Sequence, residues 1–92
     1  MKPFEIKCEV TEVRTTDEVC PGSAKCRRGE IYTLGSRTPG LEGMCQRAFH
    51  SLHPMAFAMR WTDKMDWEKK DFVEVVCPDG FVTYRLTRIR KT

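Results

Sequence analysis

The sequence contains no long apolar run, and its hydrophobic stretches fall far short of the ~20 residues that a membrane-spanning helix needs. The first ten residues, MKPFEIKCEV, alternate apolar with charged side chains and so lack the uninterrupted apolar segment of a secretory signal. Apolar residues make up 40% of the chain and charged residues 32%, a balance typical of a globular domain rather than a disordered one. We therefore expect a cytoplasmic protein with no membrane contact.

Motifs that would identify a reaction are also missing. The chain has no glycine-rich phosphate-binding loop, no Ser, His and Asp order that suggests a nucleophilic triad, and no close Cys-x2-Cys pair. Its 92 residues suit one small domain, residues 1–92, and are too few for an enzyme with a cleft between two lobes. The sequence therefore says more about the fold and about one group of cysteines than about a reaction.

The net charge is only +3, and its excess lies in the second half of the chain. Arg85, Arg88, Arg90 and Lys91 form a basic C-terminal segment, which is more typical of a solvated strand edge and tail than of a phosphate-binding surface. The mixed acidic and basic residues from Asp63 to Asp71 are typical of a solvated surface. We therefore expect no nucleic-acid partner.

Apolar and polar residues alternate from Phe4 to Val13, which predicts a half-buried strand with Cys8 among the core residues. Segments rich in β-branched and aromatic residues predict three further strands over Glu30–Leu34, Phe72–Val76 and Phe81–Ile89. The last two strands flank Cys77-Pro78-Asp79-Gly80, which is typical of a tight turn. We therefore predict a hairpin there.

The hydrophobic period changes in the middle of the chain. The spacing of one face of an amphipathic helix is followed by Cys45, Ala48, Phe49 and Leu52. Pro54 suits the first position of a new helix better than a helix interior, where proline costs ~3 kcal/mol. We predict one helix from about Gly43 to Arg60, broken or kinked at His53-Pro54.

Together these elements predict an α+β domain in which a small antiparallel sheet is covered by one broken helix. The alternating strand and the helix stripe each need an apolar partner, and a helix over a sheet is the simplest two-layer arrangement. A partly closed barrel is the alternative topology. Trp67, in the polar segment after the helix, is expected to cover the edge of the core rather than to bind a ligand.

The five cysteines are the residues with the most chemical potential. An odd number of cysteines without an export signal argues against a framework of disulfides. Four thiolates can instead hold a zinc ion or an iron–sulfur cluster. The predicted metal ligands, which lie in a loop or at the ends of elements, are Cys20, Cys26, Cys45 and Cys77.

Two other interpretations of the cysteines stay open. In the first, the protein is a thiol redox protein that uses Cys45, because the positive end of a helix dipole favours a thiolate. In the second, the thiols are packing residues and the domain is a non-catalytic adaptor that binds a partner protein. His50 and His53 are interpreted as surface or capping residues rather than as metal ligands.

The positions of the cysteines in the elements predict which of them meet. We expect Cys26, Cys45 and Cys77 to cluster, with Cys20 as a further member and Cys8 apart in the core. Sulfurs that share a zinc ion lie ~2.3 Å from it, whereas a disulfide needs two Cα atoms within about 7 Å of each other.

The chain also resembles a family of small conserved hypothetical proteins found largely in anaerobic bacteria and archaea. The resemblance covers nearly the whole chain, and its most specific residues are Cys26, Cys45, Trp67 and the Cys77-Pro78-Asp79-Gly80 turn. The resemblance implies that the chain folds as one intact unit and that its cysteines are functionally important, but it implies no particular activity.

Overall fold

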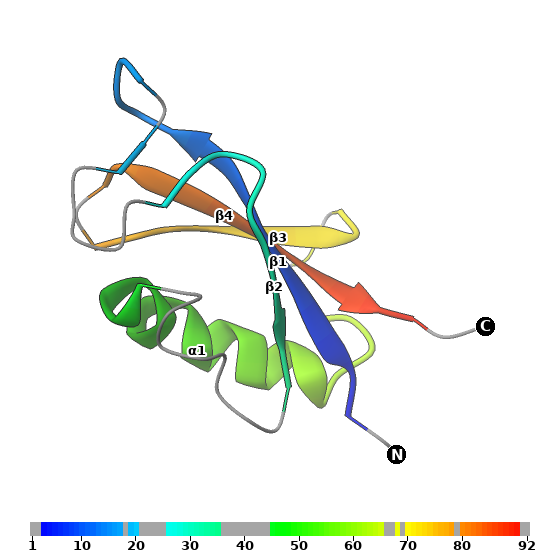
Figure 1. Ribbon diagram of the computed structural model, residues 1–92. Helices are drawn as coiled ribbons and strands as arrows, with labels where there is room; N and C mark the ends of the chain where they lie inside the picture. Colours follow the sequence, from blue (N-terminus) through cyan, green and yellow to red (C-terminus); the bar gives the residue numbers. More distant parts are fainter. Residues whose placement is uncertain are drawn as a thin grey trace.

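The computed structural model describes residues 3–17, 19–20, 26–35, 45–65, 68, 70–78 and 80–90. Within these ranges the elements follow in the order β1 (Glu5–Val13), β2 (Ile31–Leu34), α1 (Gln46–Arg60), β3 (Phe72–Val76) and β4 (Val82–Ile89). The strands form one sheet in the order β2-β1-β4-β3, and each neighbouring pair is antiparallel. Helix α1 lies across one face of this sheet (Figure 1). The predicted α+β class and antiparallel sheet are confirmed.

The sheet is open, so the alternative of a partly closed barrel is wrong. The edge strands β2 and β3 each pair with one neighbour and not with each other. Helix α1, rather than further strands, covers the apolar face of the sheet.

Strand β1 follows the predicted alternation up to Val10 and then departs from it. Ile6, Cys8 and Val10 are buried on the inner face. The register with β4 shifts between Val10 and Glu12, which leaves Thr11 as an extra residue. Because of this bulge, Val13 returns to the inner face three residues after Val10.

The core lies between the inner face of the sheet and α1. The strands contribute alternate residues to it, as expected for a sheet that is covered on one face. The largest fully buried side chains of this core are Tyr84, Ile6, Leu52, Met59, Leu86, Val10 and Val82.

Helix α1 runs without interruption through Pro54, so the predicted break at His53-Pro54 is wrong. A proline cannot donate a hydrogen bond to the carbonyl four residues earlier, here that of His50. Both His50 and Pro54 are exposed, so water can hydrate that carbonyl. Leu52 and Ala56, before and after the proline, are both buried in the core and hold the two halves of the helix in place.

The start of α1 also differs from the prediction. Cys45 is the N-cap residue, with extended backbone angles, rather than a residue of the first turn. The predicted start at Gly43 lies outside the described residues. No helix in the described ranges has the length and apolar character needed to traverse a membrane.

The predicted hairpin between β3 and β4 is confirmed. The N–H of Gly80 donates to the carbonyl of Cys77 at 2.9 Å, and the N–H of Cys77 donates to the carbonyl of Val82 at 2.9 Å. Gly80 has a φ of +81°, which a residue without Cβ adopts readily. Asp79 lies outside the described residues.

Replacement of Pro54 by alanine is expected to stabilise the protein by about 2–2.6 kcal/mol. Alanine restores the hydrogen bond to His50 and relieves a penalty of about 3 kcal/mol, while the unfolded chain regains about 0.4–1 kcal/mol of conformational entropy. Urea unfolding followed by circular dichroism measures the change. Pro3→Ala, outside the helices and strands, is the control and should not stabilise. A loss of stability in Pro54→Ala would contradict this account of the helix.

Candidate functional site

All five cysteines are free thiols in the described residues. Cys8 and Cys26 are buried, whereas Cys20, Cys45 and Cys77 are half-buried. Each of them belongs to the hydrophobic core or packs against it. All five thiols therefore lie in apolar surroundings, and a dissolved reagent reaches the half-buried thiols more readily than the buried ones.

Cys20 and Cys26 lie opposite each other across a short antiparallel bridge. Val19 pairs with Arg27, so the next residues inward, Cys20 and Cys26, stand in direct opposition. The N–H of Cys20 donates to the carbonyl of Cys26 at 2.8 Å. A fully hydrogen-bonded antiparallel pair, which exchanges two such bonds, has Cα atoms about 5.5 Å apart, within the range found in disulfides. Cys20 and Cys26 share one of these two bonds, so the backbone places the two residues opposite each other.

Polar side chains fix both arms of this bridge. On one arm, the hydroxyl of Thr15 accepts the N–H of Val19 at 3.1 Å and donates to its carbonyl at 2.9 Å. On the other arm, the Glu30 carboxylate accepts the N–H of Arg27 at 3.0 Å. The N–H of Gly29, with a φ of +94°, donates to β1 at the carbonyl of Val10 at 2.8 Å. The segments that carry Cys20 and Cys26 are therefore anchored locally and to the sheet.

Tyr84 connects the buried Cys26 to the centre of the sheet. Its hydroxyl donates to the Sγ of Cys26 at 3.6 Å. Burial raises the pKa of the Cys26 thiol, the hydrogen bond from Tyr84 opposes this rise, and the nearby Cys45, Glu30 and Cys20 add to it. Cys26 is therefore a protonated thiol at neutral pH.

Further thiols lie near Tyr84. Burial is the main cause that raises the pKa of Tyr84, and the thiols of Cys26, Cys45 and Cys8 also contribute. Burial raises the pKa of the Cys8 thiol to about 12. We call Cys8, Cys20, Cys26 and Cys45 the thiol cluster.

The thiol cluster agrees with the sequence prediction in part. Cys26 lies near both Cys45 and Cys20, as predicted. Cys8 lies in the core, as predicted, on the inner face of β1 two residues from Val10, which pairs with Tyr84. Cys77 lies at the β3–β4 turn, where its Sγ accepts the N–H of Val82 at 3.4 Å.

No three Cys, His, Asp or Glu side chains in the described ranges form a group that could hold a metal ion. His50 and His53 are exposed on α1, where the rings of Phe49 and His53 have centroids 5.5 Å apart. The zinc or iron–sulfur site of Cys20, Cys26, Cys45 and Cys77 stays a prediction. Trp67 lies outside the described residues.

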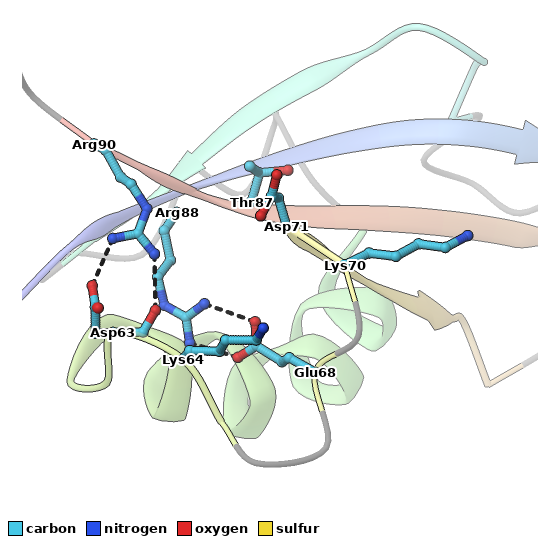
Figure 2. Close-up of a pocket in the computed structure, with 8 residues that line it drawn as sticks. All are labelled: Asp63, Lys64, Glu68, Lys70, Asp71, Thr87, Arg88 and Arg90. Carbon is cyan, nitrogen blue, oxygen red and sulfur yellow. Dashed lines mark hydrogen bonds and ion pairs between the residues drawn. The ribbon is translucent and has the colours of Figure 1, made fainter.

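A polar pocket of about 370 Å³ lies away from the thiols, between β4 and the segment that joins α1 to β3 (Figure 2). Its lining includes a buried ion pair, in which the Nη2 of Arg88 lies 2.7 Å from the Oε1 of Glu68. The two side chains are only 3% and 2% exposed. The Nε of Arg88 also donates to the carbonyls of Met59 at 2.9 Å and Thr62 at 2.7 Å.

The pocket corrects the interpretation of these residues as a solvated surface. Arg88 lies on the inner face of β4, in register with Ile6 of β1, whereas Arg90, two residues later, forms an exposed pair with Asp63 at 2.6 Å. Lys70 points away from both ion pairs (Figure 2). Because both arginines already have carboxylate partners, we assign the pocket a structural role and take the thiol cluster as the candidate site.

Comparison with known proteins finds no match to a family model, a curated protein or a solved structure. The thiol cluster is therefore interpreted from its own geometry. The sequence prediction included Cys20, Cys26 and Cys45, but it did not single out Tyr84, whose hydroxyl donates to the Sγ of Cys26. The only available signal was that a tyrosine on the inner face of a strand needs a hydrogen-bond partner in the core.

Replacement of Glu68 by glutamine is expected to destabilise the protein by about 3–5 kcal/mol, because it leaves the Arg88 charge buried without a counter-ion. Asp63→Asn removes the exposed partner of Arg90 and should cost at most about 1 kcal/mol. Urea unfolding of both variants measures the difference. Equal losses would contradict the structural role of the buried pair.

The same pair predicts a loss of stability in acid. Hydrogen bonds from Arg88 hold the pKa of the Glu68 carboxyl below its ordinary value of 4.5. A carboxyl with a lowered pKa in the folded state adds stability that is present above about pH 4.5 and is lost as the pH falls through the folded pKa. The free energy of unfolding, measured from pH 7 to pH 3, should fall more steeply for the wild type than for Glu68→Gln, because only the wild type has the Glu68 carboxyl. An identical pH dependence in both proteins would contradict the prediction.

Proposed function

We propose that the protein is a thiol redox protein that alternates between a dithiol and a disulfide at Cys20 and Cys26. The observation that carries the proposal is the direct opposition of these cysteines across the Val19–Arg27 bridge. Cys20 is half-buried and Cys26 is buried. An external oxidant therefore reaches Cys20 first, and Cys26 acts second.

Oxidation by a small-molecule disulfide, RSSR, proceeds by two exchanges. The Cys20 thiolate attacks one sulfur of RSSR, which forms a mixed disulfide and releases one RS⁻. The Cys26 thiol then loses its proton and attacks the Sγ of Cys20, which releases the second RS⁻. Both released thiolates take up the protons that the two cysteines gave up. Two protein thiols and one RSSR thus become one protein disulfide and two RSH.

The surroundings of Cys26 support its role as the second thiol. Burial keeps Cys26 protonated and unreactive until Cys20 has formed a mixed disulfide close to it. The Tyr84 hydroxyl, which donates to the Sγ of Cys26, then stabilises the thiolate that attacks. In the cytoplasm, which the sequence favours, small-molecule thiols would keep the pair reduced at rest.

Cys45 offers a different pairing within the same function. It lies at the N-terminal end of α1, where the helix dipole favours an anion, and it is near Cys26. A disulfide between Cys26 and Cys45 would make Cys45 the reactive thiol. The second candidate function is the zinc or iron–sulfur site predicted from the sequence, which would require the cysteines to move closer together, because no three of them in the described ranges form a group that could hold a metal ion. We also propose that the chain belongs to the family of small conserved hypothetical proteins that its sequence resembles, although this family has no activity to carry over.

Oxidation with glutathione disulfide tests the proposal. Reduced protein is treated with the oxidant, free thiols are alkylated, and peptides are mapped by mass spectrometry. We expect one disulfide that joins Cys20 to Cys26. Cys26→Ser should stop at a glutathione adduct on Cys20, whereas Cys77→Ser, the control, should form the disulfide as the wild type does.

The other outcomes identify the alternatives. A link between Cys26 and Cys45 would assign the reaction to Cys45. Stoichiometric zinc or iron in anaerobically purified protein, with thiols that react only after metal removal, would select the metal site. Five thiols that stay inert to the oxidant and hold no metal would contradict the redox function and leave the cysteines as packing residues.

Replacement of Tyr84 by phenylalanine should shift the second exchange step to higher pH. Loss of the hydroxyl removes the one hydrogen bond that lowers the pKa of the Cys26 thiol. The rate at which the Cys20 mixed disulfide resolves, measured from pH 6 to pH 9, reports the shift. Tyr32→Phe is the control, because the Tyr32 hydroxyl donates to Glu30 at 3.0 Å rather than to a sulfur. Equal profiles for Tyr84→Phe and the wild type would remove Tyr84 from the mechanism.

A further inference from the structure

The Glu30 side chain links the residue after Cys26 to strand β2. One oxygen of its carboxylate, Oε1, accepts the N–H of Arg27 at 3.0 Å and the hydroxyl of Tyr32 at 3.0 Å. Tyr32 is held in the sheet, in register with Cys8 of β1, and packs against the core. Because Arg27 directly follows Cys26 in the chain, this oxygen fixes the backbone beside Cys26 relative to a side chain of the sheet.

The backbone around Glu30 forms a tight turn that is docked on β1. The N–H of Glu30 donates to the carbonyl of Arg27 at 3.3 Å, and Gly29 supplies the positive φ that such a turn requires. Val10 of β1 donates to the carbonyl of Glu30 and accepts the N–H of Gly29, each at 2.8 Å. These bonds hold the second half of the turn. Toward Cys26, the turn is held by the Glu30 carboxylate and by the antiparallel bridge at Arg27.

The exchange between Cys26 and a mixed disulfide on Cys20 depends on how two short segments are placed relative to each other. A thiol held beside its target reacts as if at a high effective concentration, and a misplacement of about 1 Å can cost about a hundredfold in rate. The arm that carries Cys20 is fixed by the hydroxyl of Thr15. On the arm that carries Cys26, the side chain in the corresponding position is Glu30.

We propose that Glu30 is a positioning residue that holds Cys26 opposite Cys20 for the second thiol–disulfide exchange. This inference rests on the redox function proposed above, and it adds a residue that acts through the backbone of Arg27. The negative charge of Glu30 acts in the opposite direction, because it is one of the causes that raise the pKa of the Cys26 thiol and so disfavour its thiolate. Placement and charge therefore have opposite effects on the rate of the second exchange, and an experiment can separate them.

Two variants of Glu30 separate placement from charge. Both remove the negative charge, but Glu30→Gln keeps an acceptor oxygen for Arg27 and Tyr32, whereas Glu30→Ala removes it. The mixed disulfide on Cys20 is formed with bis(hydroxyethyl) disulfide, a neutral reagent, and its resolution by Cys26 at neutral pH is followed by acid quench and mass spectrometry. We expect Glu30→Ala to resolve it at least about tenfold more slowly than the wild type, and Glu30→Gln to resolve it at least as fast as the wild type.

The first exchange and two further variants complete the test. The rate at which the reagent first reacts with Cys20 should change by less than about twofold in every variant, because that step does not involve Cys26. Glu74→Ala is the matched control, because it removes an exposed carboxylate from β3 at the opposite edge of the sheet, and it should resolve the mixed disulfide within about twofold of the wild type. Tyr32→Phe removes one partner of the Glu30 carboxylate, so it should slow the resolution by the same factor at every pH.

The results distinguish this proposal from the redox function. If the wild type forms no disulfide between Cys20 and Cys26, both are wrong. If the disulfide forms but Glu30→Ala resolves the mixed disulfide as fast as Glu74→Ala, or Glu30→Gln is as slow as Glu30→Ala, the positioning role alone is wrong. Circular dichroism checks that each variant folds. If Glu30→Ala does not fold, Tyr32→Phe must resolve the mixed disulfide more slowly than Glu30→Gln for the proposal to stand.

Discussion

The buried guanidinium of Arg88 links the inner face of the sheet to the end of α1 and to the segment that follows it. From the inner face of β4 it donates to the carbonyls of Met59 and Thr62 and to both carboxylate oxygens of Glu68. A buried arginine is tolerated only where its donors and its charge are matched. Because these partners come from the end of α1 and the segment after it, the pairing of β4 in the sheet determines where the helix ends and where the chain turns back.

The same strand also organises the thiols. Along β4, alternate residues face the core, so Tyr84 and Arg88 lie on one face with Leu86 between them. Arg88 donates to a carboxylate, a hydroxyl and two carbonyls, whereas Tyr84 donates to the sulfur of Cys26. The apolar surroundings that make Tyr84 part of the core also keep Cys26 protonated. Burial therefore both stabilises this part of the core and raises the pKa of the Cys26 thiol.

Local patterns predicted the strands and the hairpin well, because alternation and turn residues are properties of adjacent positions. Pro54 misled the prediction, because the packing of Leu52 and Ala56 that holds the helix together is tertiary. Arg88 could have been placed inside, since it shares the parity of Tyr84 and Leu86. Glu68 could not, because its partner is 20 residues away. The opposition of Cys20 and Cys26 depends on an isolated bridge that no periodicity reveals.

The position of Cys45 decides whether thiol chemistry could influence helix α1. Cys45 is the N-cap residue, and its carbonyl accepts the N–H of Phe49 at 2.9 Å, so it is tied to the first turn of the helix. A disulfide between Cys20 and Cys26 would close within the segment before β2, outside α1. A disulfide that included Cys45 would instead pull on the first turn of α1.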